Sequence, residues 1–258
     1  MKRKVIKQGN NTLTITLPRR WTEKMGIKGG DEMEVEERGA SLLVGSEKSP
    51  SQEVTQLDTT KLGLLHKNYI SYLYQIGYDE VRITFPDKKT FEMIQEMVAE
   101  CIGFEIVDHG ENYCLIRNVA AGIHEEFDSM LRRMFLMILS MAEGSLEAIK
   151  KKQFSRFKEI ALLEKSTDRI SDFCLRILVK KGYKEYRKTP FAYSLVRDLE
   201  KMADVYRYLC DYLYEKRGLA LSKETLQLYG EVNGYLKNFY QLFYTGDRKK
   251  AVELDQGR

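Results

Sequence analysis

The sequence of 258 residues predicts a multidomain α+β protein with a small β-rich head, a short α+β unit and a C-terminal antiparallel helical bundle. Three observations predict this class. Short apolar–polar alternations separated by glycine turns fill residues 1–44. Helix and strand patterns then alternate, and from about residue 123 apolar residues recur at helical spacing. A polar stretch separates the head from the rest. The predicted boundaries are 1–46 for the head, 47–56 for a linker, 57–119 for the α+β unit and 120–250 for the bundle.

The head is predicted to contain short strands around one helical turn. Residues 13–17 alternate apolar and hydroxyl side chains, and Pro18 ends that strand because proline has no amide hydrogen for a sheet. Residues 21–25 form about one helical turn, and a hairpin follows over residues 32–44. About forty residues bury too little surface to fold alone. We therefore expect a second copy of the chain to complete this domain.

Charge is distributed unevenly along the head. The whole chain carries a formal net charge of only +4, but residues 1–28 hold eight lysines and arginines against a single acid, Glu23. The residues that follow, from Asp31, are mainly acidic. A basic start before an acidic stretch gives a small domain one positive face, which favours nucleic acid as a partner. The alternative is that these charges only keep the domain soluble.

The α+β unit is predicted in the order α-β-α-β-β. A helix is expected over residues 57–75 and a strand over 80–85, and a second helix starts at Pro86-Asp87 and runs to about residue 100. Strands at 104–107 and 113–117 form a hairpin. No chemistry is visible in this unit.

The bundle is predicted from four long stretches with apolar residues at helical spacing. These stretches cover residues 127–149, 154–179, 191–214 and 221–243. Pro190 and Ser222 are start signals for the last two helices. Short connections between such helices favour antiparallel neighbours.

Two acidic pairs lie within the bundle, Glu164 with Asp168 and Glu200 with Asp204. Each pair is spaced by four and so shares a helix face. The connection between the two helices centres on about residue 185, so facing positions have numbers that sum to about 370, and the pair centres sum to 368. The four carboxylates are therefore expected at one level. They could bind a metal ion, or they could lie outside and pair with Lys165, Arg169, Lys201 and Arg207.

Several function classes are excluded. The four cysteines and three histidines show no metal-ligand spacing, and the cysteines are expected to be reduced core residues. No nucleophile–base set, phosphate loop or dinucleotide-binding turn occurs, so we do not expect an enzyme. No apolar run is long enough for membrane insertion, and no signal peptide is visible, so a cytoplasmic protein is expected.

The head resembles the AbrB/SpoVT family, also called the swapped-hairpin or MazE-like domain, over residues 3–45. The motifs that carry the resemblance are Lys4-Val-Ile-Lys-Gln-Gly, the strand at 13–17, Pro18-Arg19, Met25-Gly-Ile-x-x-Gly-Asp31 and the closing hairpin. The resemblance implies a homodimer through this domain, in which exchanged hairpins complete a β-barrel that binds DNA. Some members instead serve as antitoxins or dimerisation modules. The implied DNA-binding residues are Lys4, Lys7, Asn10, Asn11, Arg19, Arg20 and Lys24.

Residues 120–245 resemble PhoU, the phosphate-uptake regulator family, through the two acidic pairs and the stretch Leu199-Glu-Lys-Met-Ala-Asp204. The resemblance implies a metal ion, iron or zinc, at Glu164, Asp168, Glu200 and Asp204. Together the two resemblances suggest an archaeal regulator of transcription linked to phosphate uptake, whose bundle senses a metal, phosphate status or a partner. The alternative is an interaction protein that does not bind DNA and regulates a phosphate-transport ATPase.

Overall fold

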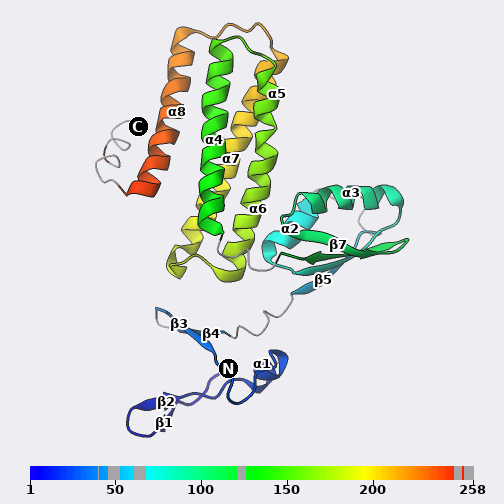
Figure 1. Cartoon of the computed structure of the whole chain (residues 1–258), viewed down its shortest axis with the longest axis vertical. Coiled ribbons are helices and arrows are strands. Elements are labelled where there is room, and N and C mark those ends of the chain that lie inside the picture. Colours follow the sequence, from blue (N-terminus) through cyan, green and yellow to red (C-terminus); the bar gives the residue numbers. More distant parts are fainter. Residues whose placement is uncertain (40, 46–52, 61–67, 121–125, 247–251, 253–258) are drawn as a thin grey trace. The chain divides into compact units, whose positions relative to one another are not determined.

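The computed structural model describes residues 1–39, 41–45, 53–60, 68–120, 126–246 and 252. The chain divides into two compact units, Met1–Val54 and Thr55–Arg258. The second unit contains both the α+β elements and the bundle (Figure 1).

Unit 1 consists of two β-hairpins and one short helix. Strands β1 (Ile6–Gln8) and β2 (Thr12–Thr14) are antiparallel, and β3 (Glu34–Arg38) pairs antiparallel with β4 (Ser41–Gly45). Helix α1 (Arg19–Lys24) lies between the hairpins in the sequence and contains Trp21, the only tryptophan of the chain. The predicted strand at 13–17 is shorter than expected, because the ladder ends at Thr14.

The predicted β-barrel is not closed within one chain. The described strands of unit 1 form two separate two-stranded sheets. Because the expected exchange would take strands from a second copy, the barrel stays a prediction.

The α+β part of unit 2 begins with a strand that the sequence reading missed. Strand β5 (Val54–Asp58) includes residues that we predicted as linker and as the start of a helix, and helix α2 covers only Asn68–Ile76. Two contacts explain the correction. Leu57 packs against the core, and the Thr59 backbone amide just beyond the strand donates to the Thr84 carbonyl at 2.9 Å. Sheet pairing therefore overrides the local helical pattern. Residues 61–67 of the predicted helix lie outside the described residues.

The sheet has the strand order β5-β6-β8-β7 and is covered by helices on one face (Figure 1). Strand β6 (Glu80–Thr84) and strand β7 (Phe104–His109) both pair antiparallel with β8 (Tyr113–Asn118). The registers place Ile83 opposite Cys114 and Val81 opposite Ile116, and all four are fully buried. They belong to one core cluster with buried side chains of α2 and of α3 (Lys88–Ala99).

Capping residues mark several helix starts as predicted. The Asp87 carboxylate accepts a hydrogen bond from the Thr90 amide at 2.8 Å and caps α3. Ser222 caps α8 (Lys223–Thr245) in the same way, through the Thr225 amide at 3.2 Å. Pro190 lies in the first turn of α7 (Thr189–Glu215), where its missing amide hydrogen costs nothing. These start signals are confirmed.

The bundle begins with α4 (Phe127–Lys150). The predicted helix at 154–179 is divided at one residue, Leu162, into α5 (Arg156–Ala161) and α6 (Leu163–Lys181). Helices α4, α6 and α7 pack on one another, whereas α8 packs mainly on α4 (Figure 1). No helix in the described ranges is both long enough and apolar enough to cross a membrane.

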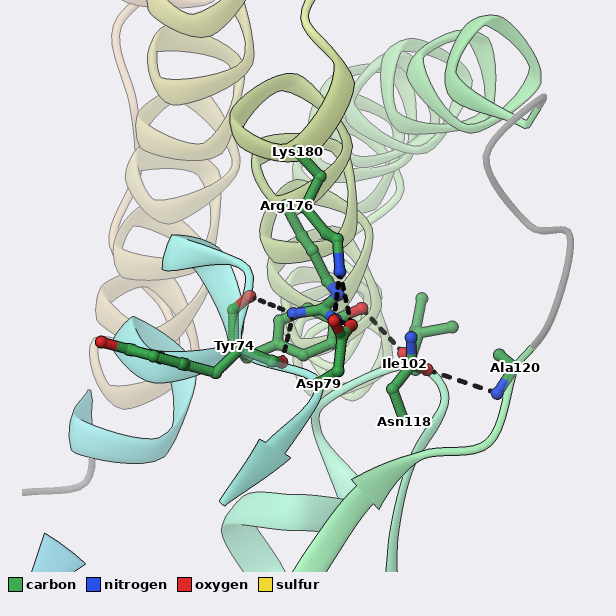
Figure 2. Close-up of polar contacts among 8 residues, drawn as sticks. Tyr74, Asp79, Ile102, Asn118, Ala120, Arg176 and Lys180 are labelled. Carbon is green, nitrogen blue, oxygen red and sulfur yellow. Dashed lines mark hydrogen bonds and ion pairs between the residues drawn. The ribbon is translucent and has the colours of Figure 1, made fainter. Parts of the chain in front are cut away.

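A buried ionic network joins the α+β part to the bundle (Figure 2). Arg176 on α6 is 3% exposed, and its guanidinium donates to the Asp79 carboxylate at 2.6 Å. The same guanidinium donates to the backbone carbonyls of Tyr74 and Tyr78, both at 2.7 Å. Lys180, one turn further along α6, donates to the other Asp79 oxygen at 2.6 Å. The network satisfies one carbonyl in the last turn of α2 and one just beyond its end, and it fixes α2 against α6, which positions the pocket described next.

Candidate nucleic-acid interface and carboxylate pocket

The predicted DNA-binding residues are all exposed and lie on three elements of unit 1. Lys4 precedes β1 and Lys7 lies within it. Asn10 and Asn11 form the turn between β1 and β2, which Gly9 opens with a positive φ of 68°. The remaining three residues lie on α1; they are Arg19, Arg20 and Lys24.

Helix α1 places two of its cations on a common face. Arg20 and Lys24 are four residues apart and therefore project side by side. Arg19 instead pairs with Glu23 at 2.8 Å, with side chains 89% and 60% exposed. An ion pair at that exposure contributes at most about 1 kcal/mol, so it does not prevent Arg19 from contacting a phosphate.

Unit 1 exposes its apolar side chains to an unusual degree. In its described residues no side chain is buried. Leu13 is 69% exposed, Val5 and Leu42 are each 61% exposed, and Val35 is 60% exposed. Burying one such side chain fully contributes about 1.5–3 kcal/mol, so covering this surface decides whether the unit is stable. The surface fits the predicted completion by a second copy.

The four predicted carboxylates of unit 2 line one pocket of about 740 Å³. Glu164 and Asp168 come from α6, and Glu200 and Asp204 come from α7. Residues of α2 and α3 complete the pocket wall. The prediction that the two acidic pairs face each other at one level of the antiparallel helices is therefore confirmed. The open alternative, in which the acids lie outside, is wrong for Glu164, which is 8% exposed.

Arginines neutralise part of this pocket. Arg207 donates to Glu164 at 2.9 Å and to Asp204 at 3.3 Å, as the pairing alternative expected. Arg197 approaches Glu200 at 3.6 Å, a partner that we did not predict although it lies three residues earlier on the same helix.

Two of the other cations named as possible partners pair elsewhere. Arg169 lies 3.9 Å from Glu100, and Lys201 lies 3.7 Å from Asp198. Lys165 lines the pocket. Arg207 is thus the cation that binds across the two acidic pairs.

Asp168 is a pocket carboxyl whose charged form is disfavoured both by burial and by neighbouring negative charges. Burial raises the pKa of its carboxyl to about 8, and the negative charges of Glu164, Glu200 and Asp204 act in the same direction. Its Oδ1 atom is buried and has no hydrogen-bond partner among the described residues. Near neutral pH the folded protein therefore keeps a proton on Asp168.

Sequence reasoning missed three further carboxyl groups in the pocket, Glu96 and Glu100 at its α3 wall and, on α6, Asp172. Asp172 follows Asp168 by four residues, so the spacing that identified Glu164 and Asp168 could have found it. Burial raises the pKa of Asp172 to about 6, although Gln75 donates a hydrogen bond to it at 2.7 Å.

The pocket does not present a ready metal site. Within the described ranges, no three or more His, Cys, Asp or Glu side chains are placed to hold a metal ion. Two of the four predicted ligands already bind Arg207. The cysteines are free and buried, as predicted, and burial raises the pKa of Cys174 and Cys210 to about 12, so these thiols stay protonated.

The comparisons with known proteins concern unit 1. Residues 6–52 match the family of MazE, a bacterial antitoxin, described as antidote–toxin recognition. No curated protein and no solved structure matches the chain. The matched residues include every described strand of unit 1 and α1. The N-terminal unit is therefore a MazE/AbrB-like domain, a class whose members bind DNA and form dimers.

Proposed function

We propose that this protein is a dimeric DNA-binding regulator whose MazE/AbrB-like head contacts duplex DNA. One observation carries the proposal. The head combines exposed cations on α1 and the β1–β2 hairpin with apolar side chains that a single chain leaves exposed. Dimerisation would cover the apolar surface and double the number of cations that face a duplex.

The residues divide into two roles in this proposal. Arg20, Lys24, Lys4 and Lys7 supply phosphate contacts, which carry most of the affinity and are sensitive to salt. Asn10 and Asn11 lie in a tight turn, where a short amide side chain can reach a base edge. An asparagine that reaches adenine in the major groove makes two hydrogen bonds and so contributes specificity.

Fluorescence anisotropy with a labelled pool of random-sequence duplexes tests this proposal. Phosphate contacts need no particular sequence, so the pool is a sufficient probe. Binding should fall steeply between 50 and 200 mM salt, on the order of 10³-fold for six or more phosphate contacts. In Arg19→Ala/Arg20→Ala, a dimer loses up to four contacts, and the logarithmic salt slope should become shallower by about 2–4.

The matched control is Lys88→Ala/Lys89→Ala, which removes two exposed cations from α3 in unit 2. This variant has the same net charge as the head variant and should bind DNA like the natural chain. Equal binding by both variants would reject the head as the DNA-binding surface.

A link to phosphate uptake is the finer part of the proposal. It rests on the resemblance of residues 120–245 to PhoU and is supported by the convergence of the two acidic pairs on one pocket. In this view unit 2 senses a metal, phosphate status or a partner and changes DNA binding by the head. In the alternative view unit 2 acts on a phosphate-transport ATPase and the head only dimerises. Phosphate uptake by cells that carry Arg19→Ala/Arg20→Ala separates the two, because normal control of uptake without DNA binding favours the alternative.

A metal ion in the pocket stays a separate prediction, because it requires Arg207 to release Glu164 and Asp204. Elemental analysis of the purified protein beside Glu164→Gln/Glu200→Gln tests it. Glu143→Gln/Glu231→Gln is the control, since those acids lie on α4 and α8 outside the pocket. Equal iron or zinc in all three proteins would end the metal hypothesis.

A further inference from the structure

Helices α7 and α8 leave an apolar groove open between them. The groove has a volume of about 850 Å³. Helix α8 turns its buried residues, Asn233 and Leu236, toward the rest of the bundle, and the Asn233 amide donates to the Ala142 carbonyl of α4 at 2.6 Å. Its next face is left exposed, with Leu228 60% and Val232 51% exposed.

The apolar side chains that line the groove, most of them exposed and two half-buried, follow the spacing of a helix–helix seam. On α8 the groove residues Leu228, Val232, Tyr235 and Phe239 are separated by four, three and four positions. On α7 the groove residues Met202, Val205 and Leu209 are separated by three and four. Alternating steps of three and four are the seven-residue pattern with which one helix packs against another. The groove therefore offers two adjacent seams for further helices.

We propose that the α7–α8 groove is filled by the α7–α8 pair of a second copy of this chain, so that the two bundles meet face to face. The proposal rests on the dimer assigned to the head under the proposed function. Eight residues, 46–53, join β4 to β5. Two copies joined at their heads would therefore hold their second units at a high effective concentration, which permits even a modest contact to form.

Charge and composition favour a second copy over other occupants. Of the described residues that line the groove, one is charged, Lys201, so the groove has no charge pattern that would select an acidic or basic partner. A self-complementary apolar face is typical of homodimer contacts, in which both copies use the same surface. The chain's own last residues, 247–258, are a poor cover, because seven of these twelve are Asp, Glu, Lys or Arg.

Cross-linking of the full-length protein tests the contact directly. The four natural cysteines are buried, so Val205→Cys/Val232→Cys adds the reactive thiols. A short bis-maleimide should join two chains of this variant. The yield of cross-linked dimer should not change on dilution, as long as the protein concentration is high enough to keep the chain dimeric. The matched control, Leu162→Cys/Phe191→Cys, places two thiols at positions that are 63% and 76% exposed and outside the groove. It should give little cross-linked dimer. Equal yields from the two variants would overturn the proposal.

A second measurement separates this inference from the dimer of the head. Val205→Glu/Val232→Glu changes only side chains that are more than half exposed, so the fold is kept. If the heads dimerise, analytical ultracentrifugation of this variant should show the mass of a dimer. Its sedimentation coefficient should be lower than that of the natural chain, because the two bundles no longer contact each other and the dimer is more extended. If the heads do not dimerise, the same variant should become monomeric while the natural chain stays dimeric. A sedimentation coefficient and a mass equal to those of the natural chain would overturn the proposal. The absence of a cross-link between two chains, with a different protein bound in the groove, would also overturn it.

Discussion

Removal of the Arg176 guanidinium should destabilise unit 2 strongly, although the residue does not line the carboxylate pocket. In Arg176→Met, three hydrogen bonds disappear, one to the Asp79 carboxylate and two to backbone carbonyls. Loss of one partner of a buried ion pair costs about 3–5 kcal/mol. Lys180 still pairs with Asp79, and the methionine side chain fills most of the space, so we expect a loss of about 3 kcal/mol at the lower end of that range.

The assay is thermal and urea unfolding followed by far-UV circular dichroism, which reports mainly the helices of unit 2. For a unit of about 200 residues, 3 kcal/mol corresponds to a fall in Tm of about 6–12 °C. The control is Arg169→Met on the same helix, whose side chain is 45% exposed and lies 3.9 Å from Glu100. Its exposed pair should be worth less than about 1 kcal/mol. Equal losses in the two variants would refute the view that the network holds α2 on α6.

Three further outcomes follow from the structure. The folded protein keeps a proton on Asp168 up to about pH 8, whereas the unfolded chain releases it near pH 4, so stability should fall as pH rises between these values. Asp168→Asn should therefore match the natural chain near pH 4 and exceed it by about 2 kcal/mol near pH 8 in urea unfolding, after allowance for partial screening by water; a constant difference would contradict this. Asp87→Ala removes the cap of α3 and should cost about 1 kcal/mol in the same assay, whereas no change would show that the cap contributes nothing. Leu13→Glu places a charge on the most exposed aliphatic side chain of the described head residues after Met1 and should break the contact between two heads and abolish DNA binding, whereas unchanged DNA binding in fluorescence anisotropy would contradict this.

The helices of the bundle could be predicted because their signals are local. Apolar periodicity and the start signals Pro190 and Ser222 located α7 and α8 within a few residues. The acidic pairs could be placed at one level because an antiparallel pair of helices fixes which positions face each other. Strand β5 could not be predicted, because the contact that favours it is made by Thr59 and Thr84, which lie 25 positions apart.

The difference between local signals and contacts made by distant residues also explains which features of the candidate sites the sequence did not predict. Arg176 has no local mark of a buried residue, and its partner Asp79 lies 97 positions earlier. The exposed apolar face of α8 could not be predicted from the sequence, because a seven-residue apolar spacing is the same whether those side chains face the bundle or the solvent. Arg207 was foreseen as a partner of the acids, since the pattern of charges on one helix is visible in the sequence.

The position of Trp21 gives the molecule a natural reporter. Because it is the chain's sole indole and lies in α1 beside Arg20, its emission comes from the head alone. The second unit contains all sixteen tyrosines of the chain but no tryptophan, so excitation at the red edge of tryptophan absorption, where tyrosine absorbs little, selects Trp21. Quenching or a spectral shift on addition of a duplex would thus localise the ligand to one end of the chain without any label or substitution.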